Sequence, residues 1–195
     1  MKVCLFGGTF DPPHVGHFII AEAIKESEKF DKMIFIPVFM PPHKEEMRVS
    51  SVEDRLEMLH LCLDPDENFE LSEVEIKRGG VSYTIDTLKE VESTYQLGAD
   101  SIYFLMGSDS LLEFHTWKNH ELILKQCRVL VAARPGFRPS RIPPRVLARI
   151  RFANMPQIEI SSSLIRDRVA HGLTIRYMVL DPVREYIAEK GLYRQ

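Results

Sequence analysis

The sequence has few cysteines, no long apolar run and no large excess of either charge. Its three cysteines, Cys4, Cys62 and Cys127, stand far apart among 195 residues, and none belongs to a CxxC pair. A disulfide framework and a zinc site built from cysteines are therefore not expected. A reducing cytoplasm is the compartment that fits this cysteine usage best.

The apolar stretches are too short for a membrane-spanning or secretory segment. One covers only residues 3–6, and the stretch at 33–40 is broken by Pro37, whereas a membrane span needs about 18 apolar residues. Lys and Arg number 25 against 28 Asp and Glu, which gives a net charge of −3. This balance does not support nucleic-acid binding over the whole surface. We therefore expect a cytoplasmic protein without membrane or nucleic-acid partners.

The sequence does contain short β-rich runs that alternate with helical periodicity, a pattern typical of βαβ units around a parallel sheet. Strands are predicted at residues 2–6, 34–37, 102–106, 129–132 and 157–160. Helices are predicted from about Phe18, at 52–63, at 85–95 with Gly98 as C-cap, and from Asp181 to Gly191. We expect a single α/β domain over residues 1–195, Rossmann-like and doubly wound with a mostly parallel sheet. Residues 170–195 would form a small helical C-terminal extension.

The first candidate site follows the first predicted strand, at residues 7–17, which read GGTFDPPHVGH. The two leading glycines let the backbone approach a ligand closely, and Gly16 permits tight packing at the next helix. His17 is predicted in the first turn of that helix, where free N–H groups and the dipole favour an anion, and His14 can face the same space. The pattern predicts a polyphosphate cradle. An ordinary turn with structural histidines, or a zinc site using both histidines, stays open.

The second candidate site is at residues 160–168, which read ISSSLIRDR and open another predicted helix. Serines at a helix start are N-cap residues by default. Ser162 and Arg166 stand four positions apart on one helical face. A hydroxyl, the N–H groups of the helix start and a guanidinium can therefore converge on one anion.

With these two segments the chain resembles the HxGH nucleotidyltransferase superfamily, in the GGTFDPPHxGH form of its nicotinate-mononucleotide adenylyltransferase branch. The resemblance runs from Lys2 to Tyr193. It implies that ATP and nicotinate mononucleotide are the partners, and that the AMP moiety of ATP is transferred to the mononucleotide. The products would be deamido-NAD (nicotinate adenine dinucleotide) and pyrophosphate, with Mg²⁺ carried by the ATP phosphates.

The same resemblance implies a role for each matching residue. The residues implied in catalysis are His17, His14, Lys44 of the segment PPHK, and Arg166. The residues implied in ATP binding are Gly7, Gly8, Thr9, Phe10, Gly16, Gly107, Asp109, Arg134, Ile160, Ser161 and Ser162. The residues implied in binding nicotinate mononucleotide are Tyr83, Thr84 and Trp117, and no metal ligand is implied. Lys118 departs from the pattern, because relatives commonly carry a second aromatic residue there.

Structural roles stay open for some of these residues: Thr84 and Asp109 as helix caps, and Trp117 as a packing residue. The arginine-rich stretch from 134 to 151 is compatible with a solvated or an oligomer-contacting face, so a homo-oligomer also stays open. Two rival activities remain. One is a sister adenylyltransferase acting on nicotinamide mononucleotide or phosphopantetheine, and the other is a nucleotide-binding module without catalysis.

Overall fold

The computed structural model describes residues 1–40, 49–63, 68–133 and 136–194. The strands are β1 (Val3–Gly8), β2 (Lys32–Pro37), β3 (Phe69–Leu71), β4 (Ile102–Gly107), β5 (Arg128–Ala132) and β6 (Ile150–Phe152). The α-helices are α1 (Val15–Glu28), α2 (Val52–Leu63), α3 (Val74–Arg78), α4 (Thr84–Tyr95), α5 (Ser108–Glu113), α6 (His120–Gln126), α7 (Pro144–Leu147), α8 (Ser162–Ala170) and α9 (Asp181–Lys190). Short 3₁₀ helices lie at Ala99–Ser101, Phe114–Thr116 and Pro139–Arg141.

The strands form one sheet in the order β3-β2-β1-β4-β5-β6, and all neighbours pair in parallel. β1 lies in the middle, where Phe6 pairs with Phe35 of β2 on one side and with Leu105 of β4 on the other. The chain therefore builds outward from β1 in one direction and then, from β4, in the other. This confirms the predicted doubly wound, Rossmann-like sheet. In such sheets ligands bind where the winding direction changes, here beyond the carboxyl ends of β1 and β4.

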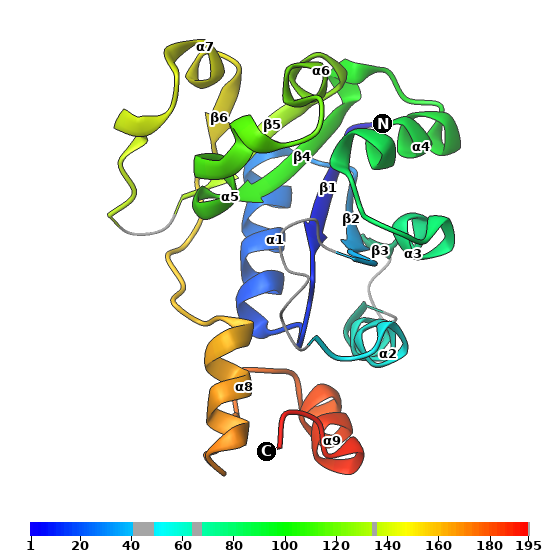
Figure 1. The fold of residues 1–195 in the computed structure, drawn as a ribbon, viewed down its shortest axis with the longest axis vertical. Coiled ribbons are helices and arrows are strands. Elements are labelled where there is room, and N and C mark those ends of the chain that lie inside the picture. Colours follow the sequence, from blue (N-terminus) through cyan, green and yellow to red (C-terminus); the bar gives the residue numbers. More distant parts are fainter. Residues whose placement is uncertain (41–48, 64–67, 134–135, 195) are drawn as a thin grey trace.

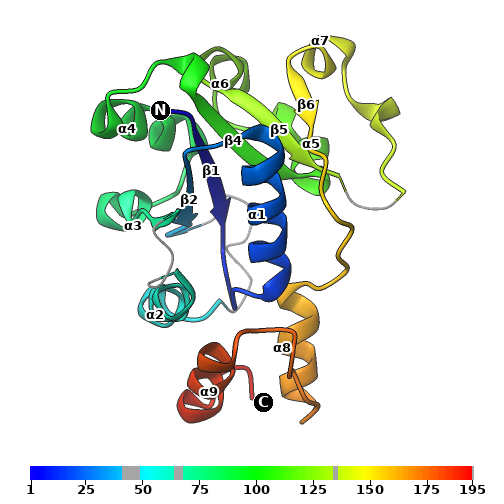
Figure 2. The ribbon, with the colours of Figure 1, turned by 180° about the vertical axis from the view of Figure 1, so that it is seen from behind.

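Helices cover both faces of the sheet (Figure 1, and from behind in Figure 2). Helices α4 to α7 pack on one face, where Ile85 and Ile123 join Leu5 of β1 in a buried cluster. Helices α1, α2, α8 and α9 contribute to the cluster on the other face, which includes Ile24 and Cys4. Burial on both sides explains why the central strands read as continuous apolar runs. Within the described residues, no helix has both the length and the apolar character that crossing a membrane requires.

The predicted strand at 157–160 is wrong, because residues 153–161 have no regular secondary structure. Its alternating isoleucines are used for packing: Ile158 lies against Gly16, and Ile160 packs against the cluster that contains Cys4. The last strand of the sheet is β6, at residues 150–152, and β3 at the opposite edge was also missed.

The predicted end of α4 at Gly98 is also wrong. Gln96 is the C-cap of α4, with a left-handed φ of 52°, and Gly98 precedes the 3₁₀ helix at Ala99–Ser101 instead. The predicted end of α9 is confirmed, because Gly191 is its C-cap with φ 64°. Glycine adopts this conformation without the steric cost that a Cβ would add.

The C-terminal end of the chain returns to the loop that follows β1. Helix α9 packs against α2, where the Tyr186 hydroxyl donates to Asp54 Oδ1 at 2.9 Å. The Tyr193 hydroxyl donates to Asp11 Oδ1 at 2.6 Å, and only 2% of Asp11 is exposed. The other oxygen of Asp11 accepts the backbone N–H of Ser50 at 3.1 Å. A buried carboxylate thus joins the first loop, the start of α2 and the C-terminal end.

We expect Tyr193→Phe to lower the free energy of unfolding by about 2 kcal/mol, because a hydrogen bond to a buried charged group is lost without a replacement. Urea unfolding measures this change. Tyr177→Phe is the matched control, since Tyr177 is 77% exposed. Equal stabilities of the two variants would contradict the role given to Tyr193.

Candidate active site

The loop between β1 and α1 begins later than predicted, because both leading glycines belong to the strand. Gly7 pairs with Ile36 and Gly8 with Pro37. A Cβ at Gly8 would lie 2.9 Å from the ring of Phe10, which is buried and has a φ of 51°. Glycine is therefore required at position 8 by the folded-back aromatic ring. The loop itself covers residues 9–14.

The two histidines of the motif form the start of α1, which begins at Val15 rather than near Phe18. His14 is the N-cap residue and is buried, whereas His17 is half-buried in the first turn. Their rings stack with centroids 3.6 Å apart and an angle of 25° between planes. A Cβ at Gly16 would meet His14 Nδ1 at 3.0 Å, so this stack also explains the glycine between them.

The hydrogen bonding of His17 fixes which of its nitrogens carries the proton. The backbone N–H of His14 donates to His17 Nδ1 at 3.1 Å, so this nitrogen is an acceptor. Burial, and secondarily the neighbouring His14, hold the pKa of His17 well below its ordinary value of 6.5. The imidazole is therefore neutral at pH 7 and carries its proton on Nε2, as an uncharged donor.

The second motif lies directly against this loop, at the start of α8. The Ser162 hydroxyl donates to the carbonyl of Pro12 at 2.8 Å, and Arg166 Nη1 donates to the carbonyl of Asp11 at 2.7 Å. Ser161 is the N-cap of α8, and its hydroxyl accepts the N–H of Leu164 at 3.2 Å. Figures 1 and 2 both show α8 beside the start of α1. The two predicted motifs, 150 and more positions apart in the chain, therefore meet.

A residue that the sequence interpretation missed holds the loop from the other side. Arg55 of α2 is 2% exposed, and its guanidinium donates to the carbonyls of Thr9 at 3.1 Å and Val38 at 2.7 Å. It donates further to the carbonyls of Phe39 and Ser50, each at 3.3 Å. Desolvation lowers the pKa of Arg55, and nearby Asp11 acts against that shift. One buried cation thus fixes the backbone that follows β1 and β2.

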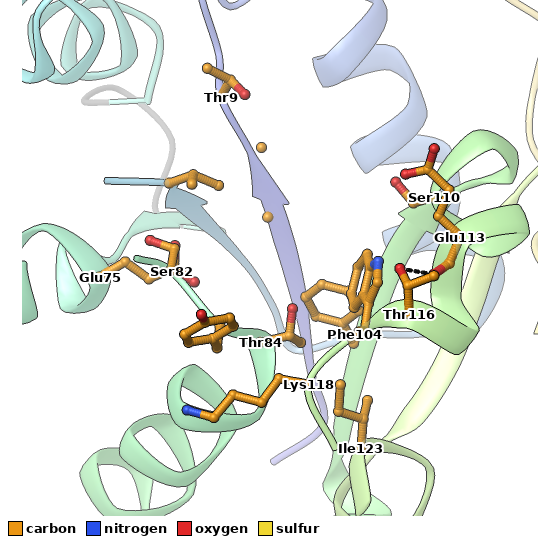
Figure 3. Close-up of a pocket in the computed structure, with 15 residues that line it drawn as sticks. Thr9, Glu75, Ser82, Thr84, Phe104, Ser110, Glu113, Thr116, Lys118 and Ile123 are labelled. Atoms are coloured by element: carbon orange, nitrogen blue, oxygen red, sulfur yellow. Dashed lines mark hydrogen bonds between the residues drawn. The ribbon is translucent and has the colours of Figure 1, made fainter. Parts of the chain in front are cut away.

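A cavity of about 610 Å³ opens beside the carboxyl ends of β1 and β4 (Figure 3). Its wall is formed by Gly7, Gly8, Thr9, Val38, Glu75, Ser82, Tyr83, Thr84, Phe104, Ser110, Glu113, Thr116, Trp117, Lys118 and Ile123. Tyr83 and Thr84 come from the start of α4, and Trp117 follows the 3₁₀ helix at Phe114–Thr116. The cavity therefore lies at the position that the sheet topology favours for a ligand.

The structure places the predicted site residues in two adjoining groups. The cavity wall includes six of them: Gly7, Gly8, Thr9, Tyr83, Thr84 and Trp117. His14, His17, Ser161, Ser162 and Arg166 gather instead where α1 and α8 begin. Phe10 joins this group through its ring, 5.0 Å from that of His17, as does Gly16 through its contact with His14.

The remaining predicted residues are placed less directly. Ile160 is half-buried just before Ser161 and packs against the cluster that contains Cys4. Gly107 ends β4, and Asp109 is exposed in the first turn of α5, next to Ser110 of the cavity wall. Lys44 and Arg134 lie outside the described residues. The alternative that Thr84 is the N-cap of α4 is wrong, because Tyr83 occupies that position.

Glu75 is a second residue that the sequence interpretation missed. It is 7% exposed and lines the cavity, and the Thr87 hydroxyl donates to its Oε1 at 2.5 Å. Burial raises the pKa of this carboxyl, while hydrogen bonding from hydroxyl groups acts against the shift. Sequence offered no signal for it, because an acidic residue in a short helix usually faces solvent.

The described residues contain no group of three or more His, Cys, Asp or Glu side chains that could hold a metal ion. His17 Nδ1 is already bound to the His14 N–H, which disfavours the zinc alternative for this histidine pair. The three cysteines are buried free thiols. Burial raises the pKa of both Cys62 and Cys127 to about 12, so these thiols are not ionised nucleophiles at neutral pH.

The chain has close relatives over its whole length. The cytidylyltransferase-like family matches residues 5–168. A protein from Exiguobacterium sibiricum, named "Probable nicotinate-nucleotide adenylyltransferase", is 44% identical over 193 residues, which cover 99% of each chain. One with the same name from Desulfitobacterium hafniense is 40% identical over 200 residues, covering 99% of this chain and 96% of its own.

Solved structures support the fold independently. The nicotinic acid mononucleotide adenylyltransferase of Plasmodium falciparum complexed with NaAD superimposes with a TM-score of 0.78 at 18% identity, covering 98% of this chain and 97% of its own. The same enzyme complexed with APC gives a TM-score of 0.77, again at 18% identity, covering 98% and 96%. At this identity the likeness concerns the fold.

We expect Arg55→Met to lower the free energy of unfolding by about 3 kcal/mol, because four backbone carbonyl groups and the buried Asp11 lose their cation. Urea unfolding measures this loss. Arg55→Lys should recover only part of it, since an ammonium group has three donors and a shorter reach. Arg145→Met is the control, because that side chain is 73% exposed. Equal stabilities of Arg55→Met and Arg145→Met would contradict this account.

Proposed function

Because the chain belongs to the cytidylyltransferase-like family and matches nicotinate-nucleotide adenylyltransferases over its full length, we propose that it transfers the AMP moiety of ATP to nicotinate mononucleotide. The products are deamido-NAD and pyrophosphate. The observation that carries the proposal is the junction of two anion-binding segments, where Ser162 and Arg166 at the start of α8 bind the loop carbonyls just before His14. The N-terminal ends of α1 and α8 therefore lie close together, and helix N-termini favour anions such as a polyphosphate.

The chemistry needs no nucleophile from the protein. A phosphate oxygen of the mononucleotide attacks the α-phosphorus of ATP, a P–O bond forms, and the bond to the bridging oxygen of the β-phosphate breaks. The attacking phosphate is already ionised at neutral pH. The task of the protein is to align two anions and to stabilise the charge that develops around phosphorus.

The residues at the start of α1 and α8 divide this task. Neutral His17 offers its Nε2–H to a phosphate oxygen, with His14 fixing its tautomer through the backbone N–H. Arg166 adds a permanent charge, and the first turn of α8 adds N–H donors. Gly7, Gly8, Thr9, Phe10, Gly16, Gly107 and Asp109, together with residues 160–162, form the rest of the ATP site. Two residues outside the described part of the chain are proposed to contribute as well, Lys44 as a phosphate contact and Arg134 as an ATP contact.

The cavity receives the mononucleotide, with Tyr83, Thr84 and Trp117 around the pyridine ring. Its aromatic and hydroxyl-bearing wall suits a polar ring. Mg²⁺ belongs to the proposal as an ion held by phosphate oxygens and water, because the described residues do not offer a set of side-chain ligands for it. The cytoplasm is the proposed location, since three buried free thiols fit a reducing compartment.

The substrate assignment is tested by pyrophosphate release with ATP and each of three acceptors: nicotinate mononucleotide, nicotinamide mononucleotide and phosphopantetheine. We expect turnover with nicotinate mononucleotide to exceed the other two, and deamido-NAD to form in equal amount with pyrophosphate. A preference for another acceptor would identify a sister enzyme. Binding of ATP without release of pyrophosphate for any acceptor would identify a module without catalysis.

We expect His17→Ala to lower kcat by about 10²- to 10³-fold, because a positioned donor to the reacting phosphate is lost. Thermal unfolding and circular dichroism should show an intact fold, and His60→Ala, at an exposed position of α2, is the control. Since the pKa of His17 is held well below 6.5, kcat of the wild-type protein should show no loss from His17 protonation between pH 6.5 and 8. Near-normal turnover of His17→Ala would exclude His17 from the mechanism.

A further inference from the structure

The described wall of the cavity has more acidic than basic side chains, although the proposed ligand is an anion. Among the described residues of its wall, Glu75 and Glu113 are acidic and Lys118 alone is basic. A ligand with a carboxylate on its ring therefore finds one side chain of opposite charge in this wall.

Lys118 lies at the end of the cavity where a pyridine ring would lie. Figure 3 shows Thr9 at one end and Lys118, beside Thr84 and Phe104, towards the other. Thr9 follows the glycines of β1 and continues into the loop that ends at His14, so the phosphate of a mononucleotide belongs at that end. The ring, at the other end of a mononucleotide, then lies near the stem of Lys118, whose ammonium group extends from there towards Asp86 of α4 (Figure 3).

The ammonium group of Lys118 is held in place by the start of α4. Its Nζ lies 2.9 Å from Asp86 Oδ2 and 4.2 Å from the centre of the Tyr83 ring. Tyr83 also lines the cavity, as does Thr84 next to it. The lysine therefore does not extend freely into solvent, although its side chain has a long flexible stem.

Asp86 restrains Lys118 without cancelling its charge for a ligand. The two side chains are 44% and 33% exposed, and an ion pair of this exposure contributes little to stability. An ammonium group has three N–H donors, and the bond to Asp86 uses one of them. Two N–H donors therefore remain for a bound carboxylate, which would share the cation with Asp86.

We propose that Lys118 is a specificity-determining residue, which favours the pyridine carboxylate of nicotinate mononucleotide over the carboxamide of nicotinamide mononucleotide through its positive charge. The two substrates have nearly the same shape, so packing against aromatic rings distinguishes them poorly. Charge distinguishes them well, because only the carboxylate is attracted by the ammonium group. This inference rests on the proposed function of the same site.

The experiment compares kcat/KM for the two mononucleotides, with saturating ATP, in wild type and in Lys118→Met, which keeps an unbranched side chain but removes the charge. We expect the ratio of nicotinate to nicotinamide to fall about three- to thirtyfold, mainly through a higher KM for nicotinate mononucleotide. Lys118→Arg should retain most of the preference. Lys190→Met, at the end of α9, is the matched control for the loss of one positive charge.

The dependence of the substrate ratio on salt concentration distinguishes a role of the Lys118 charge from a merely structural role. Raising the ionic strength should lower the nicotinate preference of the wild type and leave the ratio of Lys118→Met nearly constant. Asp86→Asn should keep or strengthen the preference, because it removes the competing carboxylate. Thermal unfolding checks that each variant is folded, and Lys118→Gln gives a second neutral variant.

The outcomes separate the inference from the function on which it rests. If the wild type forms no deamido-NAD from ATP and nicotinate mononucleotide, the proposed function fails first. If the wild type is active but the folded Lys118→Met and Lys118→Gln keep its substrate ratio, the inference about Lys118 is overturned alone. Equal losses for both mononucleotides would also overturn it, since they would show a positional role without discrimination.

Discussion

The loop between β1 and α1 is held by its carbonyl groups, and the geometry of the site depends on this restraint. Arg55 of α2 binds the carbonyl of Thr9, whereas Arg166 and Ser162 of α8 bind those of Asp11 and Pro12. The donors come from helices on either side of the loop, so neither end of it can shift without breaking one of these hydrogen bonds. Because the loop leads directly into α1, these hydrogen bonds also fix the position of the histidine pair at the start of that helix. The proposed phosphate site uses backbone groups of this loop, so its geometry depends on how firmly the loop is held.

The same restraint links parts of the sequence that share no local signal. The Asp11 carboxylate accepts from Ser50 before α2 and from Tyr193 near the C-terminal end. Residues after α9 therefore contribute to the site without touching the cavity wall in the described structure. The predicted helical C-terminal extension therefore has a defined partner in the first motif, through Tyr193 and Asp11.

The sequence predicted the centre of the fold better than its edges. β1, β2, β4 and β5 are buried on both faces, and such strands leave long apolar runs. β3 and β6 are three residues each, and β6 exposes Arg151 and Phe152, so neither leaves a distinctive pattern. Residues 157–160 show the reverse error: alternation arose from isoleucines that pack against α1 and the cluster containing Cys4, without a neighbouring strand. Hydrophobic periodicity indicates which residues are buried, and residues can be buried without being hydrogen-bonded to a neighbouring strand.

The site was predictable where its residues act through local motifs and not where they act through distant contacts. The glycines and histidines of residues 7–17 and the serines of α8 were found because turns and helix starts have local rules. Arg55 was missed because arginine in an amphipathic helix usually faces water. A signal was nevertheless present, since Arg55 lies on the helical face of Met58, Leu59 and Cys62, which are buried. A charged residue on an apolar face indicates a buried network, and the structure shows its partners.

The electrostatics of the proposed site depend on one uncharged donor, His17, and one charged side chain, Arg166. The chain has a net charge of −3, so two polyanionic substrates receive no attraction from the protein as a whole. Attraction must arise locally, from N–H groups and from cationic side chains such as the guanidinium of Arg166. Burial, and secondarily His14, hold the pKa of His17 well below its ordinary value, so its imidazole is an uncharged donor. A neutral donor adds no charge that would have to be desolvated together with the phosphates. In the proposed site, a change of pH between 6.5 and 8 therefore leaves His17 uncharged, so this histidine adds no pH dependence of its own to phosphate binding.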